Sequence, residues 1–289
     1  MAIVVDSETR LVVQGITGRE GSFHTLRNRA YGTNVVAGVT PGKGGGDVEG
    51  IPVFDTVAAA VEVTAANASL LFVPARFAAD ALSESAGAGI STIICISEGL
   101  PAHDMLQVYG TVRSRGLTMI GPNCPGALSP GKANAGIIPA EIFSEGAVGL
   151  VSRSGTLTYQ IGHELTQLGL GNSTIVGIGG DPVVGSSFVD ILEKFEADEQ
   201  TEIVVMVGEI GGDEEEKAAR YVQERMTKPV VSYIAGFTAP PGKTMGHAGA
   251  IISGSSGTAL AKKDALESCG IRVGTTPTET AQLVAEIAR

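Results

Sequence analysis

Aromatic residues are scarce in this sequence: they make up 4% of its 289 residues, and none is tryptophan. A composition so poor in aromatic residues argues against a binding protein whose site is lined by aromatic rings. The 43% hydrophobic residues and the 40 glycines favour instead an α/β enzyme whose strands end in glycine-rich loops.

Positive charge is also in short supply, because 20 lysine and arginine residues stand against 31 aspartate and glutamate residues, a formal net charge of −11. Nucleic acids and anionic membrane surfaces are bound through clustered lysine and arginine. We therefore expect neither nucleic acid nor a membrane among the partners.

Cysteines and long apolar runs are few. Cys95, Cys124 and Cys269 are odd in number and lack paired spacing, which argues against a disulfide framework and a zinc site. No apolar run approaches the roughly 20 residues that span a bilayer, and the first six residues carry no basic leader. We expect a cytoplasmic protein without a metal site.

Short apolar runs alternate with segments long enough for a helix, which predicts an α/β fold of βαβ units. Residues 121–126 and 129–131 are too rich in proline and glycine for a regular element, so we place a domain boundary near residue 122. The prediction is two five-stranded, doubly wound parallel-sheet domains, 1–122 and 123–289, whose ligands lie outside the carboxyl ends of the strands. The expected strands are 10–14, 34–39, 69–73, 91–96 and 117–120, then 147–151, 174–178, 203–207, 230–234 and 271–274.

A glycine-rich loop follows the first expected strand, with glycines at 15, 18 and 21 in the spacing G-x-x-G-x-x-G. Such a loop before a helix presents backbone amides to a phosphate, although it also suits a merely tight turn. It is one residue longer than the usual dinucleotide fingerprint, and Lys43 stands after the second strand, where NAD requires an acidic residue. The pattern favours a phosphorylated ligand other than NAD.

The fourth and fifth strands end at the same edge, in Ile96, Ser97 and Glu98 and in Asn123 and Cys124. These groups are suited to hold an adenine, a pantetheine arm or a thiol, or they are simply turn-forming loops. Cys124 lies between Pro122 and Pro125, which is unusual for a cysteine of a hydrophobic core.

His247 lies in a glycine-rich segment, 242–251, without bulky neighbours. A neutral imidazole nitrogen near neutral pH accepts a phosphoryl group as well as a proton, although a lone loop histidine is commonly just solvated. Three strand ends of the second domain converge on the same edge. There, Ser154 and Gly155 offer amides at a helix N-terminus to an anion, and Glu209 is placed to orient the second ring nitrogen.

The segment 236–244 nearly spells a P-loop, but five residues rather than four separate its glycines. We find no convincing nucleoside triphosphate site in the chain. If ATP or GTP supplies phosphate to His247, another subunit must hold that nucleotide.

The chain resembles the α-subunit family of succinyl-CoA synthetases (succinate–CoA ligases) over nearly its whole length. Seven blocks, in the same order, carry this resemblance: residues 14–18, 39–45, 121–126, 151–159, 177–182, 208–212 and 246–250. The resemblance implies an N-terminal Rossmann-like domain that binds coenzyme A and a C-terminal flavodoxin-like ligase domain. The coenzyme A site that it implies comprises Thr17, Gly18, Arg19, Glu20, Lys43, Ile96, Ser97 and Glu98, with Arg19 in place of the family's small polar residue.

The same resemblance implies that His247 is transiently phosphorylated, that Glu209 orients it, and that Tyr159 contacts the organic acid near a β subunit. The β subunit is expected to hold ATP or GTP and Mg²⁺ in a heterodimer or heterotetramer. The implied reaction joins succinate to coenzyme A through an acyl phosphate, with release of phosphate. Two alternatives remain open: a related ligase for malate or citrate, and a non-catalytic coenzyme A-binding regulator.

Overall fold

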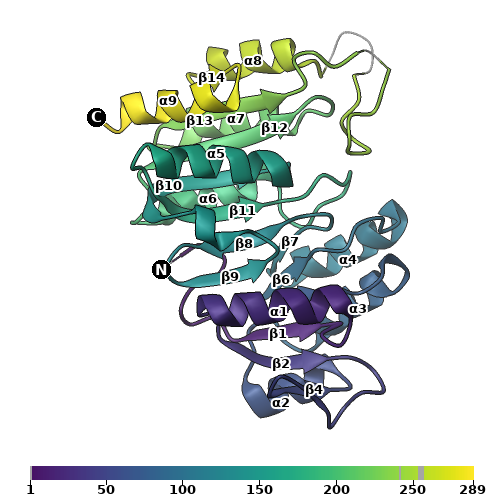
Figure 1. The fold of residues 1–289 in the computed structure, drawn as a ribbon. Helices are drawn as coiled ribbons and strands as arrows, with labels where there is room; N and C mark the ends of the chain where they lie inside the picture. The colour runs from purple at the N-terminus through teal and green to yellow at the C-terminus, as the bar shows by residue number, and fades with distance from the viewer. Residues whose placement is uncertain (1, 241, 253–256) are drawn as a thin grey trace.

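The computed structural model describes residues 2–240, 242–252 and 257–289; Met1, Pro241 and residues 253–256 lie outside the described residues. Two α/β halves are stacked along the long axis of the molecule, with the N-terminal half at the bottom of Figure 1 and the C-terminal half at the top. Within the described part of the chain, no helix combines the length and the apolar character needed to cross a membrane.

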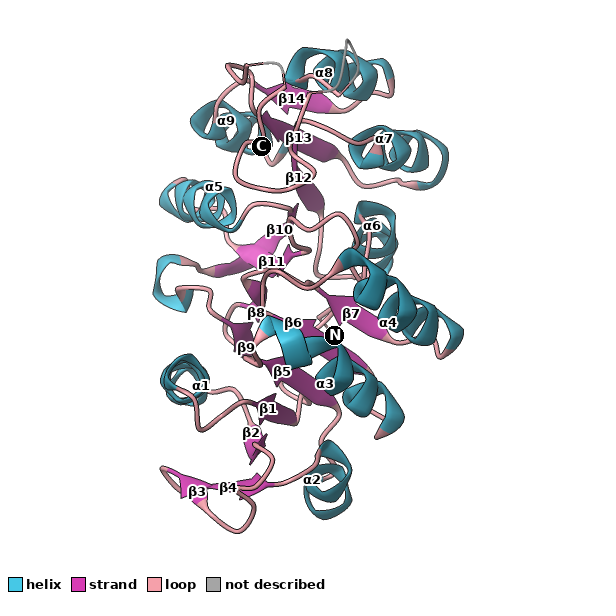
Figure 2. Ribbon diagram, turned by 90° about the vertical axis from the view of Figure 1, so that its right-hand side faces the viewer, coloured by secondary structure: helices cyan, strands magenta, loops and turns pink. Residues whose placement is uncertain are grey.

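The first half contains a seven-stranded sheet of order β3-β4-β2-β1-β5-β6-β7, parallel except for the β3–β4 pair. Helix α1 covers one face, and α2, α3 and α4 cover the other (Figure 2). Its elements are β1 (Leu11–Gln14), α1 (Arg19–Tyr31), β2 (Val35–Val39), β3 (Asp47–Val48), β4 (Ile51–Phe54), α2 (Val57–Thr64), β5 (Ala68–Leu71), α3 (Ala75–Gly87), β6 (Thr92–Cys95), α4 (Ala102–Ser114) and β7 (Thr118–Ile120).

The second half also contains a seven-stranded sheet, of order β14-β13-β12-β10-β11-β8-β9. Helices α5 and α9 pack on one face, and α6, α7 and α8 on the other (Figure 2). Its elements are β8 (Gly126–Ser129), β9 (Ala133–Gly136), a 3-10 turn (Ala140–Ile142), β10 (Glu145–Ser152), α5 (Gly155–Gln167), β11 (Asn172–Gly177), α6 (Phe188–Ala197), β12 (Ile203–Glu209), α7 (Glu214–Arg225), β13 (Val230–Ala235), α8 (Ala259–Ser268), β14 (Arg272–Gly274) and α9 (Pro277–Ile287).

The predicted α/β class with two doubly wound sheets is confirmed, and every predicted apolar run overlaps a strand. The prediction of five strands in each sheet was wrong, because β3 and β4 extend the first sheet and the antiparallel pair β8–β9 extends the second. The segment after Pro125 is a strand despite its glycines. At Gly126 a Cβ atom would lie 2.3 Å from the carbonyl oxygen of Ala135, so glycine is what lets the two strands approach.

The two halves share buried contacts rather than only a linker. One core cluster joins Leu11 and Ile94 of the first sheet to Val151 of the second. The side chain of Asn28, on α1, donates a hydrogen bond of 3.1 Å to the carbonyl oxygen of Gly136, on β9. Because these groups are buried, the strand ends of both sheets are held in a fixed relation.

Candidate active site between the two sheets

His247 and Glu209 meet at the carboxyl edge of the second sheet. Glu209 is the last residue of β12, and His247 lies in the loop between β13 and α8. Nδ1 of His247 is 2.6 Å from Oε2 of Glu209, and the two side chains are only 23% and 7% exposed. The hydrogen bond to Glu209 raises the pKa of His247, while partial burial opposes it. With Nδ1 engaged, Nε2 is the ring nitrogen that remains for chemistry.

Arg153, which follows β10, contacts the other oxygen of the same carboxylate. Its Nε is 3.2 Å from Oε1 of Glu209, and its Nη2 donates a hydrogen bond of 3.2 Å to the carbonyl oxygen of Asp181. The Glu209 carboxylate therefore lies between an imidazole and a guanidinium group. Sequence reasoning missed Arg153, although it directly precedes Ser154 in one of the seven sequence blocks.

Two glycines shape the surroundings of the imidazole. A Cβ atom at Gly180 would lie 2.3 to 2.4 Å from three ring atoms of His247, so the ring packs directly on that backbone. At Gly211, which has a φ of +87°, a Cβ atom would lie 2.1 Å from the carbonyl oxygen of Gly249. The loop is anchored by buried Ala250. His247 is thus a packed and paired histidine rather than a solvated one.

A cavity of about 430 Å³ opens beside His247 and is lined from both halves of the molecule. Burial raises the pKa of Tyr159, on α5, to about 12, so its hydroxyl remains a hydrogen-bond donor at neutral pH. The lining residues are Ile96, Glu98, Asn123, Cys124, Pro125, Ile137, Gly155, Thr156, Tyr159 and His247.

Cys124 and Asn123 connect this cavity to the first sheet. Sγ of Cys124 donates a hydrogen bond of 3.2 Å to the carbonyl oxygen of Cys95, and burial raises the pKa of the thiol, which therefore stays protonated. The side-chain amide of Asn123 donates to Oδ1 of Asp181 at 2.9 Å, and its backbone N–H donates to the carbonyl oxygen of Ser97. Despite the flanking prolines, Cys124 belongs to the hydrophobic core.

Ser154 acts locally as the N-cap of α5. Its hydroxyl accepts a hydrogen bond of 3.4 Å from the backbone N–H of Leu157. The amides at the start of the helix, including that of Gly155, have no partners within the helix. This end of α5 borders the cavity that contains His247, because Gly155 and Thr156 line it.

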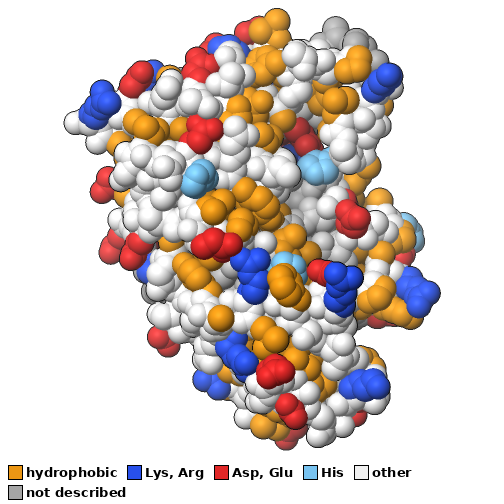
Figure 3. Space-filling view, in the orientation of Figure 1, with side chains coloured by type: hydrophobic (Ala, Val, Ile, Leu, Met, Phe, Trp, Pro, Cys, Tyr) orange, Lys and Arg blue, Asp and Glu red, His pale blue; other side chains and the backbone are white. Residues whose placement is uncertain are grey.

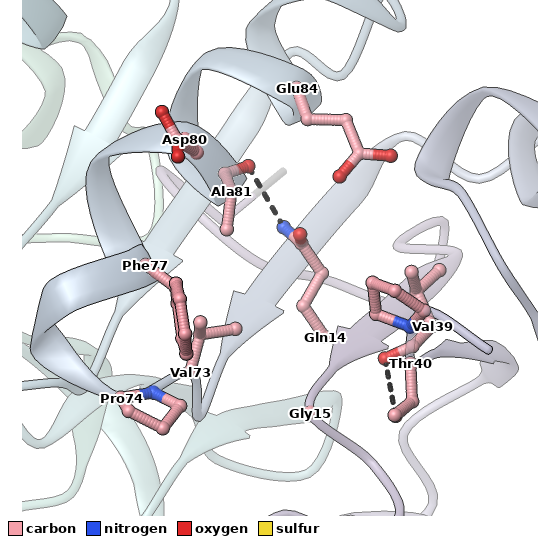
Figure 4. A pocket seen from close by; sticks show the side chains of 11 residues that line it. Gln14, Gly15, Val39, Thr40, Val73, Pro74, Phe77, Asp80, Ala81 and Glu84 are labelled. Atoms are coloured by element: carbon pink, nitrogen blue, oxygen red, sulfur yellow. Dashed lines mark hydrogen bonds between the residues drawn. The ribbon is translucent and has the colours of Figure 1, made fainter. Parts of the chain in front are cut away.

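A second cavity, of about 650 Å³, lies at the carboxyl ends of β1, β2 and β5 (Figure 4). Val39, Val73 and Phe77 make its walls mainly apolar, and the side chain of Gln14 is held by a hydrogen bond to the carbonyl oxygen of Ala81. Sequence reasoning missed these walls. The full lining is Gln14, Gly15, Val39, Thr40, Pro41, Val73, Pro74, Phe77, Asp80, Ala81 and Glu84.

The glycine-rich loop borders the larger cavity through Gly15. A Cβ atom at Gly21 would lie 2.1 Å from the carbonyl oxygen of Gly15, so the turn is tight and requires glycine at position 21. Gly18 precedes α1 and provides no side-chain cap. The predicted residues Thr17, Gly18, Arg19, Glu20 and Lys43 are all exposed, and none of them lines either cavity.

The surface is indented on the right side of Figure 3, between the upper half and the part of the lower half that carries α4. Among the described residues, no group of three or more histidine, cysteine, aspartate or glutamate side chains is arranged to hold a metal ion. The chemical groups available here are an imidazole, a carboxylate and helix amides beside a cavity of about 430 Å³.

Comparison with protein families shows what class this arrangement belongs to. Residues 6–99 match the family model described as CoA binding domain, and residues 151–271 match the one described as CoA-ligase. The fold and the paired histidine therefore belong to a CoA ligase with a CoA-binding domain before its ligase domain.

The chain is similar over its full length to known ligase subunits. It is 62% identical to succinate–CoA ligase [ADP-forming] subunit alpha 2 of Archaeoglobus fulgidus, covering 99% of this chain and 100% of that protein. It is 57% identical to succinate–CoA ligase [ADP-forming] subunit alpha of Aquifex aeolicus, covering 99% and 95%. The chain belongs to the family of succinate–CoA ligase alpha subunits.

Solved structures show the same fold in a longer protein. The ATP citrate lyase of Methanothrix soehngenii, solved in complex with citrate and coenzyme A, superposes with a TM-score of 0.88 at 24% identity. The match covers 98% of this chain and 50% of that chain, so this chain spans about half the length of that enzyme. At this level of identity the likeness shows a shared fold.

Proposed function

We propose that the chain is the catalytic alpha subunit of an ADP-forming succinate–CoA ligase in the cytoplasm. It would act with a β subunit to form succinyl-CoA reversibly from succinate and coenzyme A. The observation that carries the proposal is the 2.6 Å contact between Nδ1 of His247 and Glu209 at the edge of a cavity. The relatives are named as subunits of ADP-forming ligases, which favours ATP as the nucleotide.

Coenzyme A would bind to the first domain, which we propose ends near residue 122. The larger cavity suits the apolar parts of the ligand, and the uncapped amides in the first turn of α1 suit its phosphates. The smaller cavity, at Cys124, would receive the thiol end. The proposed contacts are Thr17, Gly18, Arg19, Glu20, Lys43, Ile96, Ser97, Glu98, Asn123 and Cys124.

His247 would carry the phosphoryl group from the nucleotide to succinate. With its Nδ1–H donated to Glu209, the lone pair on Nε2 attacks the terminal phosphorus of ATP, and ADP leaves. Glu209 stabilises the positive charge that develops on the ring. Ser154 and the free backbone amide of Gly155, at the start of α5, would hold the phosphoryl oxygens; the backbone N–H of Ser154 itself donates to Oγ of Ser152 at 3.0 Å.

Succinate would then take the phosphoryl group from His247 as an acyl phosphate. The coenzyme A thiol attacks the acyl carbon, and phosphate leaves. Tyr159 would contact the organic acid, because its hydroxyl remains a donor at the wall of the cavity. We propose that ATP and Mg²⁺ bind mainly to the β subunit, since this sequence lacks a convincing P-loop.

The test is to mix the chain with a matching β subunit, ATP and Mg²⁺, without the other substrates to detect the phosphorylated chain and with succinate and coenzyme A to detect the product. We expect formation of succinyl-CoA and an acid-labile, base-stable phosphate on this chain. His247→Ala should abolish both. His103→Ala, which changes an exposed histidine on α4, is the matched control and should change neither. Absence of activity in the wild-type complex, or label that persists in His247→Ala, contradicts the proposal.

A further inference from the structure

Lys262 and Glu215 form an ion pair in the interior of the second half. Lys262 lies on α8 and Glu215 on α7, and both side chains are fully buried. The ammonium group donates a hydrogen bond to Oε2 of Glu215 and is 3.6 Å from Oε2 of Glu216. Burial raises the pKa of Glu215, and the adjacent Lys262 opposes that effect.

Stability alone does not account for such a pair. Removing two charges from water is costly, and replacing a buried ion pair by apolar residues of similar volume is often neutral or stabilising. Two apolar side chains would therefore be enough to pack α7 against α8. The charged groups call for a second reason.

That reason lies in the second oxygen of Glu215, which reaches the site already described. Oε1 accepts a hydrogen bond of 3.1 Å from the backbone N–H of Glu209. At Gly208 a Cβ atom would lie 2.4 Å from Cγ of Glu215, so the Glu215 side chain packs against the last residues of β12. Glu215 thus holds the backbone from which the Glu209 carboxylate projects.

Lys262 connects Glu215 to helix α8, which follows the loop that carries His247. Helix α8 begins where that loop ends, and the backbone N–H of Gly211 donates a hydrogen bond of 2.8 Å to the carbonyl oxygen of Gly257, just before α8. One ion pair therefore connects the backbone of Glu209 with the helix that follows the His247 loop. Neither Lys262 nor Glu215 lines the cavity beside His247.

We infer that Glu215 and Lys262 are a positioning pair: Lys262 balances the charge of the buried Glu215 carboxylate, and Oε1 of Glu215 holds the backbone N–H of Glu209 and thereby sets the Glu209–His247 hydrogen bond. This role rests on the proposed function, in which His247 receives the phosphoryl group. The geometry itself does not depend on that function.

The experiment compares two double variants that both remove the ion pair. Glu215→Gln/Lys262→Met leaves an amide oxygen to accept from Glu209 N–H, whereas Glu215→Met/Lys262→Met leaves no acceptor. The control is Lys263→Met, which breaks the neighbouring Lys263–Glu267 pair on the same helix. The first measurement is the pKa of His247 by NMR in the full chain. The second is the rate of His247 phosphorylation with the β subunit, alongside the melting temperature.

We expect Glu215→Met/Lys262→Met to lose about ten- to a hundredfold in phosphorylation rate, because small misplacements of reacting groups have effects of that size. The pKa of His247 should fall, since Glu209 raises it, while Arg153 and burial lower it and Asp181 adds only a weak opposing effect. Glu215→Gln/Lys262→Met and Lys263→Met should stay close to the wild type in the phosphorylation rate and in the pKa of His247.

Equal behaviour of the two double variants, whether both are normal or both impaired, overturns the inference. If the double methionine variant does not fold, Glu215→Asp replaces it, because the shorter side chain withdraws the acceptor but keeps a charge beside Lys262. A wild-type rate and His247 pKa in Glu215→Asp likewise overturn it. Failure of the wild-type complex to phosphorylate His247 refutes the proposed function instead, while the pKa comparison still tests the positioning pair.

Discussion

Glu209 lies between two potential cations at the proposed active site. One oxygen faces Nδ1 of His247 at 2.6 Å, and the other faces Nε of Arg153 at 3.2 Å. The hydrogen bond to Glu209 raises the pKa of His247, whereas partial burial and the charge of Arg153 act in the opposite direction. A carboxylate placed in this way fixes the ring and chooses which nitrogen is free.

A raised pKa predicts the pH dependence of phosphorylation. Only the neutral imidazole is a nucleophile, so the rate should rise with pH and reach half its maximum above the ordinary histidine value of about 6.5. In Glu209→Gln the midpoint should move down, because the opposing effects of burial and Arg153 remain. The measurement is a rate profile together with NMR titration of His247. A midpoint unchanged in Glu209→Gln contradicts this prediction.

The same shift has a consequence for stability. Since the pKa is higher in the folded state, the His247–Glu209 interaction stabilises the fold fully below about pH 6.5 and loses that effect as the pH rises through the folded pKa. His24 provides an internal reference, because burial lowers its pKa. Its titration should be unaffected by Glu209→Gln.

Among the elements, the loop between β11 and α6 connects the two halves at the site. Its Gly180 lies against the ring of His247, and its Asp181 accepts hydrogen bonds from Asn123 and Arg153. The N–H of Gly185 donates to the carbonyl oxygen of Gly121 at 2.8 Å. One loop thus contacts the end of the first sheet, the arginine and the histidine.

Gly180→Ala tests this loop. The added methyl group would meet the His247 ring at 2.3 to 2.4 Å, so the ring must move. We expect phosphorylation to fall by about a hundredfold, a stability loss of about 1–3 kcal/mol from overpacking, and little change in coenzyme A binding. Gly110→Ala, on α4 with open space around it, is the matched control for rate and melting temperature. A wild-type phosphorylation rate in Gly180→Ala would show that the ring does not rest on this backbone.

At the scale of the whole molecule, the two sheets share one of three core clusters of the described residues, and each half also has a cluster of its own. Buried residues of both sheets belong to a single cluster, and α1 packs on β9 through the Asn28–Gly136 hydrogen bond. Thr33 also exchanges hydrogen bonds of 2.8 Å with the backbone of Asn134. Breaking the molecule between its halves would expose apolar surface and leave buried polar groups without partners.

We therefore predict a single cooperative thermal transition rather than one for each half. Differential scanning calorimetry should give equal calorimetric and van't Hoff enthalpies. Asn28→Ala, which leaves the carbonyl oxygen of Gly136 without its partner, should lower the melting temperature but keep one transition. Two resolved transitions in the wild-type chain would contradict a shared core.

Much of the fold could be predicted from the sequence, because the strands depend on local patterns of residues. A parallel strand buried on both faces is a short apolar run, so all ten predicted runs matched strands. The short strands β3, β4, β8 and β9 were not predicted, because none of them is a long apolar run. The sequence also led us to expect His247 and Glu209 at one edge of the sheet, and they lie in contact there, since β12 ends at Glu209 and His247 follows β13. The roles of all the site residues stay predictions: His247, Glu209, Ser154, Gly155, Tyr159 and the coenzyme A contacts.

The sequence by itself determined the α/β class, the strand runs and the residues with chemical potential, because each is set by neighbours along the chain. Only the tertiary structure decided that Gly180 supports the imidazole and that Arg153 contacts Glu209. It also decided that Glu215 pairs with Lys262 and accepts a hydrogen bond from the backbone of Glu209. These are contacts between residues far apart in sequence, and they exist because packing the two sheets and their helices brings particular side chains together. No local pattern specifies which distant partners will meet.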